Sequence, residues 1–172
     1  MSTPTGKPRG YLEKILCFDV ETTGLVFKNN PVYDPKSGER HQVISWGLII
    51  ADAATLTPIE EKYIEVKWNE ESKRQREEDP TFGTHAEKVH GLTFDHLEEN
   101  GIDEEEAVVE IGNLILKHWG PNVSVKTMGH NVHLFDLQFM RDMFERFGID
   151  ISTGSRHYDT NSLGFFTVGA FN

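Results

Sequence analysis

The sequence predicts a single α/β domain whose sheet begins with antiparallel strands and continues in alternation with helices. Three observations support this prediction. Short apolar runs lie close together in the first half of the chain, apolar stripes with helical spacing dominate the second half, and no internal repeat or linker divides the 172 residues. A chain of this length can bury enough apolar surface to fold unaided.

The first half is predicted to form three strands. Residues 14–19 are a short, nearly continuous apolar run, typical of a central strand, and residues 43–51 (VISWGLIIA) form a second one. Residues 62–68 (KYIEVKW) alternate apolar and polar side chains, which fits a third strand with one wetter face. The short connections favour antiparallel hairpin pairing. The polar stretch 69–79 is assigned to a solvated loop or an exposed helix.

Two short helices are predicted next. Residues 84–90 fit a helix that Gly91 stops, because glycine tolerates the backbone conformation that commonly ends helices. Thr93 is a candidate cap for another turn through Glu98.

Two longer helices and a fourth strand follow. Asp103 is a suitable N-cap for a helix that ends at residues 120–121 (Gly-Pro). Residues 123–128 fit the fourth strand, and a helix is predicted from about residue 133 to 147. The apolar stripe of the first of these helices consists of Val108, Ile111, Ile115 and Trp119.

Composition limits the class of protein. No apolar run approaches the roughly 20 residues that span a bilayer. The polar residues 1–10 are expected to form a flexible leader before one domain over residues 11–172. The single cysteine, Cys17, excludes an intrachain disulfide and favours a reducing, cytoplasmic location. A net charge of −11 argues against passive nucleic-acid binding through a broad basic surface, but not against an enzyme with a metal site.

Residues 17–24 (CFDVETTG) contain the most informative pattern. Asp19 and Glu21 lie on one face of the strand, about 7 Å apart, where they repel each other. A divalent cation such as Mg²⁺ or Mn²⁺ would explain why they are held together. The alternative is a strand end with two solvated acids. The following residues 22–24 (Thr-Thr-Gly) would let backbone N–H groups approach a phosphate.

Two further groups of residues are candidates for chemistry. Asp136 is expected within about the first turn of the amphipathic helix that follows the fourth strand. Alternatively, Asp136 is an ordinary helix-start acid and Asn131 an ordinary N-cap. His85 and His90 could contact the phosphates or sugar of a ligand, or could be structural histidines. Spacing alone leaves these alternatives open.

Taken together, these motifs resemble the DEDD superfamily of 3′→5′ exonucleases, in its DnaQ-like branch. The matching residues are 19–25 (DVETTGL), 89–93 (VHGLT), 129–131 (GHN) and 135–136 (FD). Residues 157–160 (HYDT) look like the segment with the sequence DT that follows in the family. Their order and spacing extend the resemblance over most of the chain.

The resemblance implies a ribonuclease-H-like fold, with a mixed five-stranded sheet of three antiparallel strands followed by parallel ones, flanked by helices. In the family, two divalent ions, Mg²⁺ or Mn²⁺, are held by three acids that match Asp19, Glu21 and Asp136. Asp19 would bridge both ions, Glu21 would hold the ion that positions the attacking water, and Asp136 would act on the second ion. Hydrolysis in this family releases 5′-mononucleotides from the 3′ ends of nucleic acids.

The same resemblance implies contacts with single-stranded DNA. The backbone of Thr22, Thr23 and Gly24 would contact the terminal 3′-OH, and Leu25 would pack against the terminal bases. His85, His90, Asn131 and Phe135 complete the set of candidate substrate-binding residues. RNA is an alternative substrate, and a polymerase or a second copy of the chain is left open as a partner.

One motif of the family does not occur. The family places a histidine or tyrosine a few residues before a fourth aspartate, after the DT segment, and residues 161–172 contain no such pair. Residues 157–159 come too early to replace it. We expect that the chain is truncated at its C-terminus, which would leave this site without its general base. The alternatives are a partner that completes the site, or an inactive module that binds nucleic-acid ends or a protein.

Overall fold

The structure is a computed structural model that describes residues 13–26, 30–121, 124–153 and 157–160. The expected leader, residues 1–10, and the apolar C-terminal segment, residues 161–172, lie outside the described residues. Among the helices that the structure describes, none is long and apolar enough to cross a membrane.

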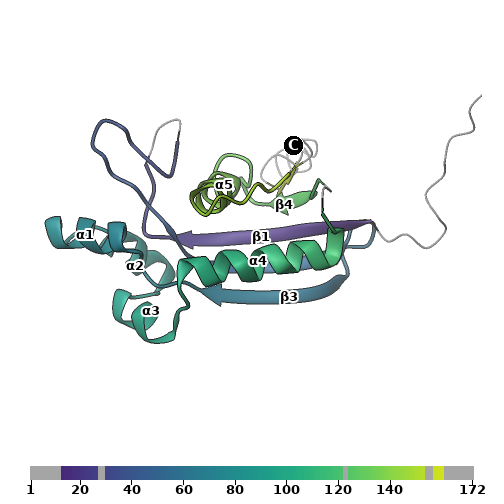
Figure 1. The fold of residues 1–172 in the computed structure, drawn as a ribbon, viewed down its shortest axis with the longest axis horizontal. Coiled ribbons are helices and arrows are strands. Elements are labelled where there is room, and N and C mark those ends of the chain that lie inside the picture. The colour runs from purple at the N-terminus through teal and green to yellow at the C-terminus, as the bar shows by residue number, and fades with distance from the viewer. Residues whose placement is uncertain (1–12, 27–29, 122–123, 154–156, 161–172) are drawn as a thin grey trace, which may run out of the picture.

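Five strands form one mixed sheet in the order β3-β2-β1-β4-β5 (Figure 1). The first three strands pair in antiparallel fashion, and β4 and β5 add to β1 in parallel, which confirms the predicted architecture. The strands are β1 (Lys14–Thr22), β2 (Val43–Asp52), β3 (Pro58–Glu65), β4 (Thr127–Gly129) and β5 (His157–Asp159).

Five helices accompany the sheet. Figure 1 shows α1, α2 and α3 gathered beyond the end of the sheet at which β1 finishes, while α4 runs alongside the strands. The helices are α1 (Glu70–Glu78), α2 (Thr84–His90), α3 (Phe94–Asn100), α4 (Glu104–Trp119) and α5 (Asp136–Arg146).

Local signals predicted the short helices well. Gly91 ends α2 with a φ of 80°, and the Thr93 side chain caps α3 by accepting a hydrogen bond from the backbone N–H of His96. The stretch left as a loop or an exposed helix is helical, and the Asn69 side chain caps α1 by accepting from Ser72 N. Asp103 precedes α4 as predicted, but its side chain makes no capping hydrogen bond and lies 3.5 Å from Lys67 Nζ.

The third strand was predicted with the wrong limits, although residues 62–65 do belong to it. It covers Pro58–Glu65 rather than 62–68, because the turn after β2 sets its register. Asp52 N donates to Thr57 O and Leu56 N donates to Asp52 O, so pairing with β2 begins at Pro58. Beyond β3, Val66 N still donates to Ile44 O of β2 at 2.8 Å, and Val66 also forms a parallel bridge with Ile102.

Two other boundaries also differ from prediction. β4 is confined to Thr127–Gly129, because it pairs with β1 only at Leu16 and Cys17. α5 begins at Asp136 rather than near residue 133, which makes this acid its first helical residue.

Both long helices pack on the same face of the sheet. Leu16, Phe18 and Val20 alternate along β1 and enter one apolar core with side chains of α4 and α5. Cys17 and Asp19, on the opposite face of β1, are half-buried and exposed, respectively. A smaller core beneath α1–α3 consists of Ile44, Trp68, Phe82 and Leu97.

Candidate functional site

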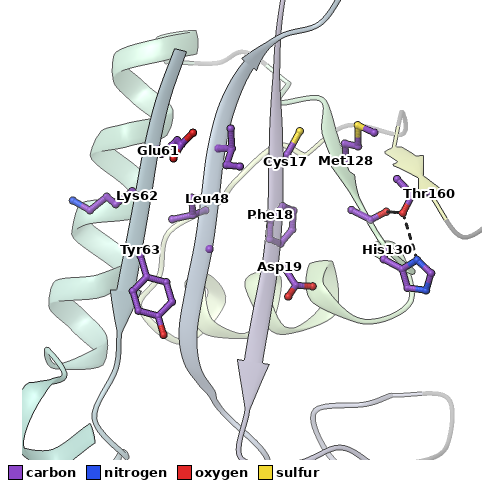
Figure 2. A pocket seen from close by; sticks show the side chains of 13 residues that line it. Cys17, Phe18, Asp19, Leu48, Glu61, Lys62, Tyr63, Met128, His130 and Thr160 are labelled. Atoms are coloured by element: carbon purple, nitrogen blue, oxygen red, sulfur yellow. Dashed lines mark hydrogen bonds between the residues drawn. The ribbon is translucent and has the colours of Figure 1, made fainter. Parts of the chain in front are cut away.

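Asp19 and Glu21 lie on the face of β1 that α4 and α5 leave uncovered. Asp19 is exposed and Glu21 is half-buried. In β2, Gly47 pairs with Asp19 of β1 and has no side chain. A hollow of about 660 Å³ therefore extends from Asp19 over Gly47 to Tyr63 (Figure 2). Burial raises the pKa of Glu21, the charge of His90 lowers it, and the charge of Asp19 raises it further.

Asp136 is attached to the strand that carries these two acids. The backbone N–H of Val20, which lies between Asp19 and Glu21 in sequence, donates to Asp136 Oδ1 at 3.1 Å. The parallel pairing between β1 and β4 stops at Cys17, so this N–H has no strand partner and the carboxylate takes that place. The backbone of β1 thus fixes the third candidate ligand beside the first two.

The second oxygen of Asp136 has no partner among the described residues. Asp136 is only 1% exposed, and its Oδ2 is a buried atom without a hydrogen bond. Burial raises the pKa of Asp136 to about 7, and the charges of Asp19 and Asp159 add to this effect. A buried carboxylate oxygen without a donor is costly, so its environment fits a cation as the missing partner.

The acids converge without forming a finished metal site. Across the residues that the structure describes, no three His, Cys, Asp or Glu side chains are already grouped so that they could hold an ion. Hard oxygen donors of this type suit Mg²⁺ or Mn²⁺.

A second pocket, of about 540 Å³, begins at Glu21 and extends away from the sheet. The end of β1 forms one wall and α2 forms another. The pocket brings together eight residues that the sequence singled out, namely Glu21, Thr22, Thr23, Gly24, Leu25, His85, His90 and Phe135.

The Thr-Thr-Gly segment (the Thr22–Gly24 turn) bends at Thr23 in the wall of this pocket. Thr22 and Thr23 are buried, and Thr22 Oγ1 donates to Gly24 O at 2.8 Å. Gly24 has a φ of 151°, and a Cβ at this position would come within 2.6 Å of His41 Cε1. Glycine is therefore required here by conformation and by space. Leu25 follows at the rim and is 37% exposed.

His90 lines the same pocket as Glu21 and has one ring nitrogen without a partner among the described residues. Its Nδ1 accepts from Leu92 N at 3.0 Å, which assigns the proton of the neutral ring to Nε2. Nε2 is buried and has no partner among the described residues. Because His90 also influences the pKa of Glu21, its ring lies where it could serve a ligand bound beside that acid. His85 lines the same pocket and is exposed.

Asn131 is placed differently from the other candidates. It does not line the pocket with Glu21, and it adopts a left-handed conformation with a φ of 56°. Its backbone N–H donates to Asp159 Oδ1 at 3.0 Å, which ties the start of the 131–135 turn to β5. This contact also brings Asp159 close enough to Asp136 to affect its pKa.

Several residues of the site could not be found from the sequence. Glu39, His41 and Phe82 line the second pocket, and Tyr63 lines the hollow beside Asp19. The segments that contain them carry no motif, and only the folded chain brings them next to the acids. Gly24 was the one local sign, because its missing side chain leaves room for His41 to lie against the backbone.

Comparison with solved structures identifies similar folds. Escherichia coli exonuclease I bound to a dT13 oligonucleotide matches with a TM-score of 0.60 and 19% identity, over 85% of this chain and 27% of that chain. The zinc-bound form of the Escherichia coli exonuclease I complex with single-stranded DNA matches with a TM-score of 0.61 and 18% identity, over 85% of this chain and 27% of that chain. Exonuclease I from Methylocaldum szegediense matches with a TM-score of 0.62 and 20% identity, over 90% of this chain and 29% of that chain.

The chain therefore spans less than a third of the length of these similar structures. The likeness shows a shared α/β fold, with the mixed parallel and antiparallel sheet and the helices described above. No family model matches the sequence, and neither does any curated protein.

Proposed function

We propose that this chain is the exonuclease domain of a metal-dependent enzyme of the DnaQ-like DEDD type. It would hydrolyse phosphodiester bonds at the 3′ ends of single-stranded DNA and release 5′-mononucleotides. One observation carries the proposal: the carboxylate of Asp136 is bound to the backbone between Asp19 and Glu21, with one oxygen unpartnered among the described residues. The fold shared with DNA-bound exonuclease I structures supports it.

The donor set fits divalent cations. Asp19 offers an exposed carboxylate, Glu21 a half-buried one, and Asp136 a buried oxygen that lacks a donor within the described ranges. Two Mg²⁺ or Mn²⁺ ions bound there would lower the pKa of a water molecule and neutralise charge on the phosphate. The raised pKa values of Glu21 and Asp136 indicate that these acids are held at an electrostatic cost, which bound cations would offset.

The pocket of about 540 Å³ would receive the terminal nucleotide. Its polar walls are the turn at Thr22–Gly24 and the side chains of His85 and His90, which suit a sugar hydroxyl and a phosphate. Leu25 and Phe135 add apolar surface against which a base can pack whatever its identity. Such contacts favour single-stranded ends without reading a sequence.

The test uses a 3′-labelled DNA oligonucleotide incubated with the chain and Mg²⁺ or Mn²⁺. Because residues 161–172 lack the family's histidine or tyrosine motif, we expect labelled mononucleotide to appear only slowly with the wild-type chain. The rate should fall by a further factor of at least about 100 in Asp19→Asn, because one shared metal ligand is lost. His118→Gln, in a histidine at the far end of α4 that pairs with Glu60, is the control and should keep wild-type activity.

The alternative functions give different results in the same assay. Oligonucleotide binding without release, unaffected by Asp19→Asn, would contradict the enzyme and favour a binding module. An RNA oligonucleotide of the same sequence, degraded faster than DNA, would favour an exoribonuclease.

A further inference from the structure

A buried histidine lines the proposed nucleotide pocket beside the Thr-Thr-Gly segment. His41 lies two residues before β2 and is 5% exposed. Its Nδ1 lies 3.2 Å from Thr23 Oγ1, and its Nε2 lies 3.1 Å from Glu39 Oε1. Both ring nitrogens therefore have partners, one of them in the Thr-Thr-Gly turn.

The hydrogen-bond network assigns the protons. Glu39 Oε1 can only accept, so His41 Nε2 carries a proton. Nδ1 of a neutral ring is then free to accept from the Thr23 hydroxyl, which itself accepts from Gln42 N at 3.1 Å. Nδ1 then accepts, and Nε2–H donates to the Glu39 carboxylate. Burial lowers the pKa of His41, which agrees with a neutral ring.

The faces of the same ring join two parts of the molecule. One face stacks on Phe82, with centroids 5.1 Å apart and an interplanar angle of 6°. The Gly24 backbone lies against the imidazole, because a Cβ there would reach 2.6 Å from Cε1. Phe82 in turn meets Trp68 edge to face, at the centre of the small core under α1–α3.

His41 thus lies between the two walls of the pocket. The turn at Thr22–Gly24 forms one wall, and Phe82 closely precedes α2, which carries His85 and His90 on the other. We propose that His41 is a positioning residue for nucleotide binding, which holds the Thr22–Gly24 turn at a fixed distance from α2. This inference rests on the proposed function, and it assigns to His41 no contact with the substrate.

The position of the turn can be measured without any substrate. Thr23 N donates to Gln42 O and Val26 N donates to Pro31 O, so these amides mark the two ends of the turn. In His41→Phe, which keeps the ring and the stack but loses both hydrogen bonds, we expect their hydrogen exchange to quicken by at least about 10-fold. His118→Phe, in a histidine whose side chain is 6% exposed and paired with Glu60, is the control and should leave it unchanged.

Two conservative variants separate the hydrogen bonds. His41→Asn can place an oxygen near the position of Nδ1 and retain the contact with Thr23, whereas His41→Gln reaches towards Glu39. We expect Asn to restore slow exchange at the turn and Gln not to do so. Where His41→Phe does not fold, Thr23→Val removes the hydroxyl contact without changing the ring, together with the hydrogen bond that this hydroxyl accepts from Gln42 N.

The substrate readout distinguishes positioning from a general loss of structure. In His41→Phe we expect the KM for a DNA oligonucleotide, and the Kd for dTMP with Mn²⁺, to rise by about 10-fold, while kcat changes by less than about 3-fold. Wild-type exchange at Thr23 and Val26 together with a wild-type KM would overturn the inference. If the wild-type chain neither binds dTMP nor releases nucleotides, the proposed function fails, and the exchange data still decide whether His41 positions the turn.

Discussion

Asp136 has two oxygens in different situations, and this difference has a thermodynamic consequence. Oδ1 accepts a backbone hydrogen bond and Oδ2 has no donor among the described residues, so the protonated acid is favoured in the folded protein. Its pKa rises from 3.8 to about 7. Because the folded state then binds more protons than the unfolded state between these values, stability falls as pH rises through this range.

We therefore predict that Asp136→Asn stabilises the metal-free protein above pH 7, by about 2 kcal/mol, since roughly 1.4 kcal/mol accompanies each pKa unit and part is lost to an unpartnered amide. Urea unfolding at several pH values would measure this. The difference between variant and wild type should shrink from pH 7 towards pH 4, where the wild-type acid is protonated. Glu99→Gln, at an exposed acid of α3, should show no such trend. Equal pH dependence in Asp136→Asn and wild type would contradict the prediction.

Gly24 shows how one residue can be restricted by both conformation and space. Its φ of 151° suits glycine, and His41 occupies the space that a side chain would need. We predict that Gly24→Ala lowers the free energy of unfolding by about 2 kcal/mol.

The matched control for this substitution is Gly148→Ala. Gly148 also has a positive φ, 68°, but an added Cβ there would meet no atom within 4 Å beyond its chain neighbours, so only the conformational cost applies. Chemical denaturation of both variants compares them. A loss at Gly148 as large as that at Gly24 would remove the close contact with His41 as the cause.

At the scale of elements, an ion-pair network fixes α5 against α4. Arg146 donates two hydrogen bonds to Glu104, at 2.7 and 2.5 Å, and a third to Asp142 at 3.0 Å. Asp142 also accepts from Arg40, in the segment before β2. Glu104 is 8% exposed, so its ion pair with Arg146 is largely shielded from water. The network holds α5, the helix that begins with Asp136.

We predict that Glu104→Ala destabilises the fold by about 3 kcal/mol, because the Arg146 guanidinium loses its buried partner. The double variant Glu104→Leu with Arg146→Met should recover most of this loss, since it removes both charges and keeps apolar volume. Urea unfolding of Glu104→Leu, of Arg146→Met and of the double variant would complete a double-mutant cycle and measure the coupling between the two side chains. Additive effects of the two single substitutions would show that the pair is not coupled.

The elements also show which parts of the fold were predictable. The limits of α2 and α3 follow from Gly91 and Thr93, which act on their own neighbours in sequence. The start of β3 depends on the register with β2, which the turn at residues 52–57 sets, and no residue within 62–68 reports it. Local chemistry could therefore be predicted, and pairing between elements could not.

At the scale of the whole molecule, the topology assembles the site. Asp19 and Glu21 could be placed on one face from strand alternation alone, whereas Asp136 reaches them only because β4 lies beside β1 and ends early. The sequence suggested this third acid through a resemblance. It could not show that a vacant backbone N–H would hold it, nor that His41 and Phe82 would line the pocket.

We predict that Mn²⁺ or Mg²⁺ raises the thermal midpoint of the whole chain, because an ion that binds only the folded state stabilises it by mass action. At a concentration of 100 times the Kd this amounts to about 2.7 kcal/mol. Asp19→Asn should weaken the effect and Glu99→Gln should retain it, which thermal unfolding with increasing metal would measure. An equal rise in both variants would place the bound ion elsewhere.

The link between Asp136 and the amide of Val20 has a consequence for mutagenesis. The donor is a main-chain group, so every amino acid except proline supplies it, and the Val20 side chain points into the core instead. A saturation scan of position 20 would therefore report tolerance to side-chain volume and would overlook the anchor of the third acid. Replacing the amide with an ester at this single bond would remove the donor and leave the core intact, so that the anchor is tested by a change of backbone chemistry rather than of side chain.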